Sequence, residues 1–142
     1  MKKWEFNKVT SYTISAKRGC LKSLEYFHKE AKVDFTSLDS SGQNAIFYAV
    51  VGGSIPCAEY LVKRVKLNYK ICNRLNGNSL VRQTGIVDIV KWCCEVLKLD
   101  PHRYNFSGQN CLRLAVEAEN LQSVKYLYMK MGFNPYAADN YG

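Results

Sequence analysis

Residues 39–49 read Asp39-Ser-Ser-Gly42-Gln-Asn44-Ala-Ile-Phe-Tyr-Ala49. Nearly the same pattern returns as Asn105-Phe-Ser-Gly108-Gln-Asn110-Cys-Leu-Arg-Leu-Ala115, and it begins again as Asp139-Asn-Tyr-Gly142. A weaker copy starts at Asn73, so the starts are spaced by 34, 32 and 34 residues. A frame of about 33 residues is typical of stacked arrays, in which no single unit buries its apolar face alone.

Each repeat combines a tight turn with two helices. Because glycine adopts positive φ without a Cβ penalty, a turn is expected at Gly42, Gly77, Gly108 and Gly142. Side chains that cap a helix N-terminus occupy one equivalent position, namely Thr10, Asn44, Ser79 and Asn110. In the second helix, apolar residues recur at three- and four-residue steps around a polar position that holds Glu25, Glu59, Lys91 and Lys125.

One aromatic residue occupies the same place in every second helix: Tyr26, Tyr60, Trp92 and Tyr126. A stacking ladder for nucleic-acid bases is one interpretation. The position lies on the apolar face of the helix, however, and a buried ring removes roughly 150–250 Å² from water. We therefore expect these rings to form a core spine.

Composition excludes several classes of protein. The chain has 142 residues, 47% of them hydrophobic, which suits one ordinary packed domain spanning residues 1–142. No run approaches 18 apolar residues, and no apolar stretch follows the basic N-terminus, so neither a membrane span nor a secretory signal is expected. The six cysteines form no Cys-x-x-Cys pair and only two histidines are present, so we expect reduced apolar thiols, no metal site and no cofactor.

The pattern resembles the ankyrin repeat, most clearly over residues 39–65 and 105–132 and more weakly over 10–32 and 77–99. The resemblance implies an all-α ankyrin-repeat solenoid of about four stacked helix-turn-helix units, at about 1–38, 39–72, 73–104 and 105–138. The family's Thr-Pro-Leu-His motif is replaced by Asn44-Ala-Ile-Phe47 and Asn110-Cys-Leu-Arg113, so its bracing histidine is missing. Gly77 and Gly85 lie only 8 residues apart, which predicts a shortened or distorted first helix in the third unit.

Residues 139–142 begin a further repeat turn. Stacked arrays need polar caps, because an end repeat otherwise exposes its inner face. We therefore favour a segment of a longer array over a natural end in which these residues only close the last loop.

The resemblance implies a scaffold or adaptor that binds another protein through a concave face and the turn tips. Aromatic residues supply much of the energy at binding hot spots, so Tyr48 and Phe106 are the leading candidates, although Tyr48 could instead tuck against the neighbouring turn. The full set carried over by position is Ser40, Ser41, Gln43, Tyr48, Val51, Arg74, Leu75, Asn78, Phe106, Ser107, Gln109, Leu114 and Glu117.

The sequence bears on other classes of function as well. No nucleophile with a base, carboxylate pair or phosphate loop is visible, so an enzyme is not expected. The net charge of +8 leaves open a basic component of a nucleic-acid-containing or other large assembly, through Lys2, Lys3, Lys8, Lys17 and Arg18. A regulatory segment of a larger enzyme or channel is also open. We expect an intracellular protein, cytoplasmic or nuclear.

Overall fold

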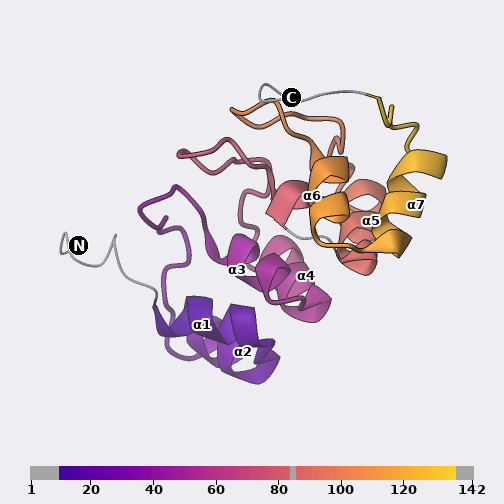
Figure 1. Cartoon of the computed structure of the whole chain (residues 1–142). Coiled ribbons are helices and arrows are strands. Elements are labelled where there is room, and N and C mark those ends of the chain that lie inside the picture. The colour runs from indigo at the N-terminus through magenta and orange to yellow at the C-terminus, as the bar shows by residue number, and fades with distance from the viewer. Residues whose placement is uncertain (1–9, 84–85, 137–142) are drawn as a thin grey trace. The chain divides into compact units, whose positions relative to one another are not determined.

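The computed structural model describes residues 10–83 and 86–136, and within these ranges it contains helices and no strand (Figure 1). The expected all-α class is therefore confirmed. The chain divides into two compact units, Met1–Asn73 and Arg74–Gly142. The expected repeat start at residues 139–142 lies outside the described residues.

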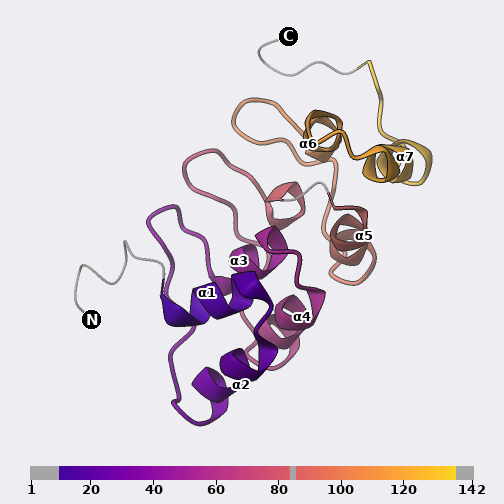
Figure 2. The same cartoon turned by 60° about the horizontal axis from the view of Figure 1, so that its bottom comes forward.

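The first unit holds two helix pairs. They are α1 (Ser11–Arg18) with α2 (Leu21–Lys29), and α3 (Ala45–Val51) with α4 (Ile55–Lys63). Helix α1 packs on α3 and α2 on α4, so equivalent helices of consecutive repeats lie side by side (Figures 1 and 2). Leu24, Ile46, Phe47 and Leu61 are fully buried between the two pairs.

The second unit repeats this layering with one change. It contains the 3-10 helix η2 (Leu80–Gln83), α5 (Val87–Glu95), α6 (Cys111–Glu117) and α7 (Leu121–Met129). The first helix of the third repeat is thus a single four-residue turn, as its short spacing predicts. Helix α6 packs on η2 and α7 on α5, around the buried side chains of Leu80, Ile89, Val90 and Leu127.

Three of the expected capping residues and three of the expected turn glycines take the roles predicted for them. The side chains of Thr10, Asn44 and Asn110 accept hydrogen bonds from amides in the first turns of α1, α3 and α6. Ser79 directly precedes η2. Gly42, Gly77 and Gly108 have φ of 78°, 77° and 72°, in the left-handed region that favours glycine.

A second set of left-handed residues follows the second helices. Lys32, Lys66 and Lys98 have φ of 51°, 63° and 57°. In the fourth repeat the equivalent position is held by Gly132, at φ 67°. An L-residue in this conformation costs roughly 1–2 kcal/mol, so three repeats carry a local strain that the fourth avoids.

The expected aromatic spine is only partly present. Trp92 and Tyr126 are buried and Tyr60 is half-buried, but Tyr26 is 58% exposed, so the prediction is wrong for Tyr26. Tyr60 bonds His28 of the preceding second helix, and Tyr126 bonds Glu95 in the same way. Tyr26 belongs to the first repeat, so no preceding second helix among the described residues can cover it.

The first helices approach each other closely in the first unit. Ala16, Ala49 and Val50 are buried where α1 meets α3, as their small size predicts. At the end of α3, a Cβ added to Gly52 would lie 1.8 Å from the carbonyl oxygen of Lys17. Gly52 therefore lets the backbones of α1 and α3 meet without an intervening side chain.

Candidate functional site

The turn tips of the second and fourth repeats share one hydrogen-bonded geometry. The Oδ1 of Asp39 accepts hydrogen bonds from the amides of Ser41 and Gln43, at 2.8 and 2.9 Å. The Oδ1 of Asn105 accepts in the same way from Ser107 and Gln109, at 3.0 and 2.9 Å. These side-chain bonds fix the loop backbone before anything binds to it.

In the second unit, the third and fourth tips are joined. The amide of Phe106 donates to the carbonyl of Asn76 at 2.8 Å, and the side-chain amide of Asn105 donates to the Oδ1 of Asn78 at 2.9 Å. The Phe106 ring lies on the backbone of Gly77, where an added Cβ would be 2.6 Å from a ring carbon. Two rigid loops thus form one surface.

This joined surface presents large apolar side chains to solvent. Leu75 is 74% exposed and Phe106 is 69% exposed, on neighbouring tips. The other expected residues of these tips are Arg74, which is exposed, and Asn78, Ser107 and Gln109, which are half-buried. On α6, Leu114 is half-buried and Glu117 is exposed. The second unit therefore brings eight of the thirteen expected residues into two adjoining tips and one helix.

Tyr48 takes a bracing position in the first unit. Its hydroxyl donates to the Oδ2 of Asp39 at 2.7 Å, so it ties α3 to the tip of the same repeat. Burial first, and then the Asp39 carboxylate, raise the pKa of Tyr48 to about 12. Around it, Ser40 and Val51 are exposed, whereas Ser41 and Gln43 are half-buried. Tyr48 therefore bonds the turn of its own repeat, and its contact with a partner stays a prediction.

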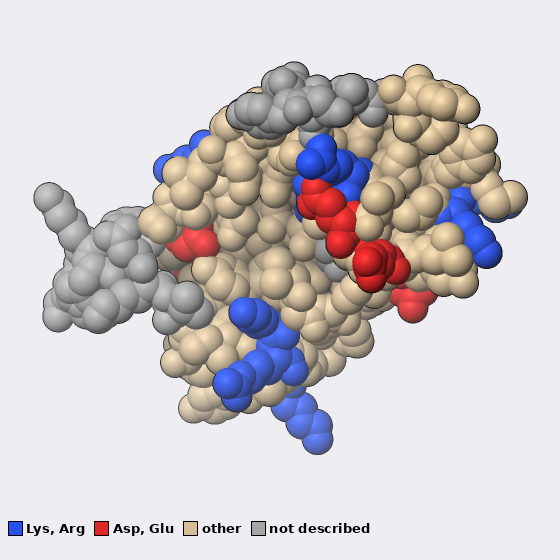
Figure 3. Space-filling model, viewed as in Figure 1, with Lys and Arg blue, Asp and Glu red and all other residues tan. Residues whose placement is uncertain are grey.

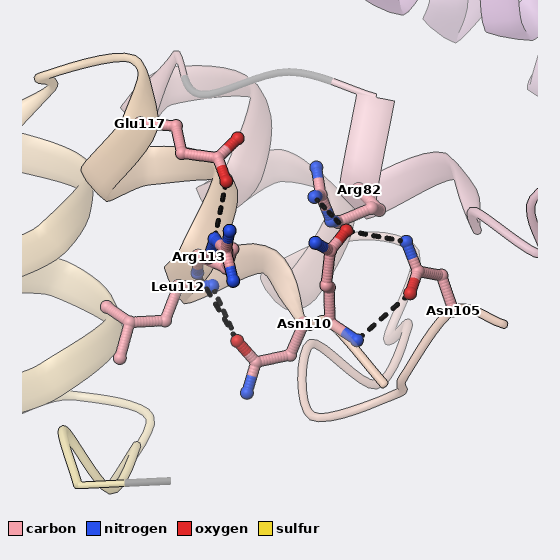
Figure 4. Close-up of polar contacts among 7 residues, drawn as sticks. Arg82, Asn105, Asn110, Leu112, Arg113 and Glu117 are labelled. Atoms are coloured by element: carbon pink, nitrogen blue, oxygen red, sulfur yellow. Dashed lines mark hydrogen bonds and ion pairs between the residues drawn. The ribbon is translucent and has the colours of Figure 1, made fainter. Parts of the chain in front are cut away.

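Two arginines occupy equivalent places on the first helices of the second unit, and of these Arg82 was not anticipated. Arg82 on η2 and Arg113 on α6 are each the third residue after the capping position (Figure 4). Arg113 pairs with Glu117 one turn further along α6. The equal spacing of Arg82 from Ser79 and of Arg113 from Asn110 is the sequence pattern that indicates their equivalence.

Arg82 is an unusual buried cation. It is 8% exposed, and its Nη2 donates to the Oε1 of Gln109 at 3.4 Å (Figure 4). Its Nε has no hydrogen-bond partner among the described residues. Burial lowers the pKa of Arg82, and the charge of Glu117 partly opposes this shift. The Glu117 carboxylate therefore stands near two guanidinium groups.

The cysteines are free thiols with contrasting environments. Cys57, Cys93, Cys94 and Cys111 are buried as expected, but Cys20 is exposed. Burial raises the pKa of Cys93 and of Cys111 to about 12, so both thiols are protonated at neutral pH. Over the described ranges, no group of three or more His, Cys, Asp or Glu side chains could hold a metal ion. No described helix is long and apolar enough to cross a membrane.

The fold and its braced tips define a helical repeat protein of the kind that presents loops from a stacked scaffold. The family model described as ankyrin repeats (3 copies) matches residues 13–139. The chain therefore belongs to the ankyrin repeat family.

Two known proteins add to this finding. A fowlpox virus (strain NVSL) protein named as an ankyrin repeat protein, FPV022, is 28% identical over 103 residues, which are 72% of this chain and 17% of the viral protein. The chain thus spans only a small part of that relative. The solved complex of the Bd0816 predatory endopeptidase of Bdellovibrio bacteriovorus with the immunity protein Bd3460 contains a chain of similar fold, at TM-score 0.60 and 14% identity. That match covers 96% of this chain and 88% of the other.

Proposed function

We propose that this chain is a protein-binding scaffold whose main contact surface is the pair of joined tips in the second unit. The observation that carries the proposal is the exposure of Leu75 and Phe106 on loops held by hydrogen bonds. Ankyrin repeats generally mediate protein–protein interaction, and the similar fold above comes from a protein complex. Chemistry by this chain itself is not part of the proposal.

Rigidity is what makes these exposed side chains useful. A flexible loop loses conformational freedom when it binds, and that loss offsets part of the contact energy. Asn105 fixes the fourth tip from within, and Asn76 and Asn78 hold it to the third tip. A partner therefore meets an aromatic and an aliphatic side chain on a preformed surface, which is the arrangement of a binding hot spot.

The first helices extend the proposed surface. Leu114 and Glu117 lie on α6, where Arg113 pairs with Glu117, whereas Arg82 on η2 is buried and adds no exposed charge (Figure 4). We propose that a partner contacts the apolar tips and the charged residues of α6 together. In the first unit, Ser40, Ser41, Gln43, Tyr48 and Val51 form a more polar counterpart.

Phe106→Ala and Leu75→Ala are the direct tests. The partner would first be captured from cell extract and identified by mass spectrometry, and its Kd would then be measured by calorimetry. Each change should weaken binding by about tenfold or more, as expected for a hot-spot residue. The matched controls are Tyr26→Ala and Ile14→Ala, exposed residues of α2 and α1, which should change the Kd by less than about twofold.

Equal effects of Phe106→Ala and Tyr26→Ala would contradict the proposed surface.

A chain that binds nucleic acid through its basic residues is the second candidate, since Lys17 and Arg18 are exposed at the end of α1. Lys2, Lys3 and Lys8 lie outside the described residues. Phosphate binding weakens steeply with salt, whereas an apolar protein contact does not, so the Kd at low and high salt separates the two.

A further inference from the structure

A groove separate from the tips runs between α5 and α7 in the second unit. Its volume is about 250 Å³. Val87 and Lys91 line it from α5, and Gln122, Lys125, Tyr126 and Met129 line it from α7. Lys130, at the C-cap of α7, also lines the groove. Helices α5 and α7 lie side by side in this unit (Figure 2).

The floor of the groove is apolar and fixed. Tyr126 is buried, and its hydroxyl donates to the Oε1 of Glu95 at 3.0 Å. The ammonium group of Lys91 lies 5.5 Å from the centroid of the Tyr126 ring. Met129, by contrast, is 73% exposed beside this floor. An apolar side chain entering the groove would cover Met129 and Val87 without displacing Tyr126.

The rim of the groove is basic. Lys91, Lys125 and Lys130 surround the apolar floor, and basic side chains gather over α7 in Figure 3. Ion pairs join Lys29 to Glu25 and Arg113 to Glu117, but within the described ranges none of the three rim lysines forms one. The nearest acidic residues on these helices are Glu95, which Tyr126 holds, and Asp88 in the first turn of α5.

This basic rim is not a property of the repeat itself. The positions of Lys91 and Lys125 are held by Glu25 and Glu59 in the two repeats of the first unit. The same face of the second helices is therefore acidic at these positions in one unit and basic in the other. A reversal of sign at equivalent positions changes which charged partner is attracted.

We propose that the α5–α7 groove binds an acidic peptide segment of a partner protein, with one large apolar side chain in the groove and flanking carboxylates on the rim lysines. Drug-sized ligands occupy pockets of about 300–1,000 Å³, so a smaller groove suits a single side chain. The lysines supply charge complementarity to the carboxylates. An apolar floor favours this occupant over a nucleic-acid backbone. The inference is independent of whether the tips bind a protein.

The test uses the full chain labelled with ¹⁵N and a capped peptide in which one leucine stands between two pairs of glutamates. Amide signals would be followed by NMR at physiological salt during titration. Saturable shifts are expected at Lys91 and across residues 122–130. Peptides with glutamine for glutamate, or alanine for leucine, should each bind more weakly. The loss with glutamine should grow as salt is lowered, because charge attraction is then less screened.

Charge reversal on the rim gives the matched comparison. Lys125→Glu with Lys130→Glu should weaken peptide binding by about tenfold or more, because two attractive contacts become repulsive. Lys22→Glu with Lys63→Glu makes the same change in net charge on α2 and α4, and should change the Kd by less than about twofold. The far-UV spectrum of each variant checks that the helices remain.

Four results would overturn the inference. One is a peptide that shifts no groove signal at millimolar concentration, and another is equal weakening by the two double variants. A third is tighter binding of a single-stranded oligonucleotide or of anionic lipid vesicles at the same residues, which would assign the groove to those ligands. The fourth is concentration-dependent change of the same signals without peptide, which would assign it to a second copy of this chain.

Discussion

Gly52→Ala tests the closest backbone contact in the first unit. Gly52 has φ −77° and ψ −8°, a conformation that any L-residue adopts. On backbone grounds alone, alanine should stabilise the fold by about 0.4–1 kcal/mol, because the unfolded chain has less freedom to lose. The new methyl group, however, would lie 1.8 Å from the Lys17 carbonyl oxygen, 2.6 Å from its carbon and 2.9 Å from its Cα.

The size of the effect follows from these distances. Side-chain Cβ atoms essentially never approach heavy atoms within 3.0 Å, so α1 and α3 must separate by at least 1.2 Å (3.0 minus 1.8). All three obstructing atoms belong to the backbone or its Cα, so no side-chain rotation relieves the overlap. Separation loosens the packing of Ala16 and Ala49. Overpacking costs roughly 1–3 kcal/mol, so we expect a net loss of about 2 kcal/mol.

Urea unfolding followed by circular dichroism measures this loss. Thermal unfolding should show a Tm lower by about 8 °C, at about 4 °C per kcal/mol for a chain of this size. Ala118 is the matched control, because it occupies the position of Gly52 in the last helix pair with φ −80° and ψ 0°. Ala118→Gly should cost only the entropic term of about 0.4–1 kcal/mol. A Gly52→Ala variant as stable as the parent chain, or more stable, would refute the close approach of α1 and α3.

Three further predictions concern strain, pH and a buried charge. Lys66→Gly should raise the free energy of unfolding by about 0.5–1 kcal/mol, measured in urea, and Gly132→Lys should lower it similarly, because both positions have positive φ. The pKa of Tyr48 is raised from 10 in the unfolded chain to about 12 in the fold, so its contribution to the free energy of unfolding is present below pH 10 and is lost as the pH rises toward 12. Urea titrations of Tyr48→Phe across this pH range should lack that loss of stability. Arg82→Met should leave the free energy of unfolding within about 1 kcal/mol of the parent value or raise it, because it removes a poorly bonded buried cation. A loss of more than about 3 kcal/mol for Arg82→Met would show that the guanidinium holds the fold together.

The repeat frame made most of the backbone predictable. Asn44 and Asn110 cap their helices because an amide oxygen at that position satisfies free amides of the first turn, a rule that depends only on neighbours in sequence. The shortened first helix of the third repeat follows from the small number of residues between Gly77 and Gly85. Tyr26 was mispredicted because burial depends on whether another repeat covers the face, which the residue itself does not encode.

The surface was less predictable than the backbone, for a physical reason. The exposure of Phe106 follows from its position at a tip. The packing of its ring on Gly77, however, requires two loops from different repeats to meet. Tyr48 has the same aromatic character, yet Asp39 draws its hydroxyl inward. The burial of Arg82 could not be predicted because charged side chains are mostly exposed, and only tertiary packing buries this one. Tertiary contacts, rather than residue types, decide these cases.

The two units present different surfaces on the same kind of repeat. Asp39 and Asn105 build the same loop, but Ser40 stands in the first unit where Phe106 stands in the second. The side-chain bonds that fix each loop come from the residue before it, and in the second unit the Phe106 ring also packs on Gly77. The tip residue can therefore differ while the loop keeps its bonds, and the charge differs between the equivalent positions of Glu59 and Lys125. The apolar tip and the basic groove both occur in the second unit. We therefore expect the full chain to keep its affinity for the partner when exposed residues of the first unit are changed.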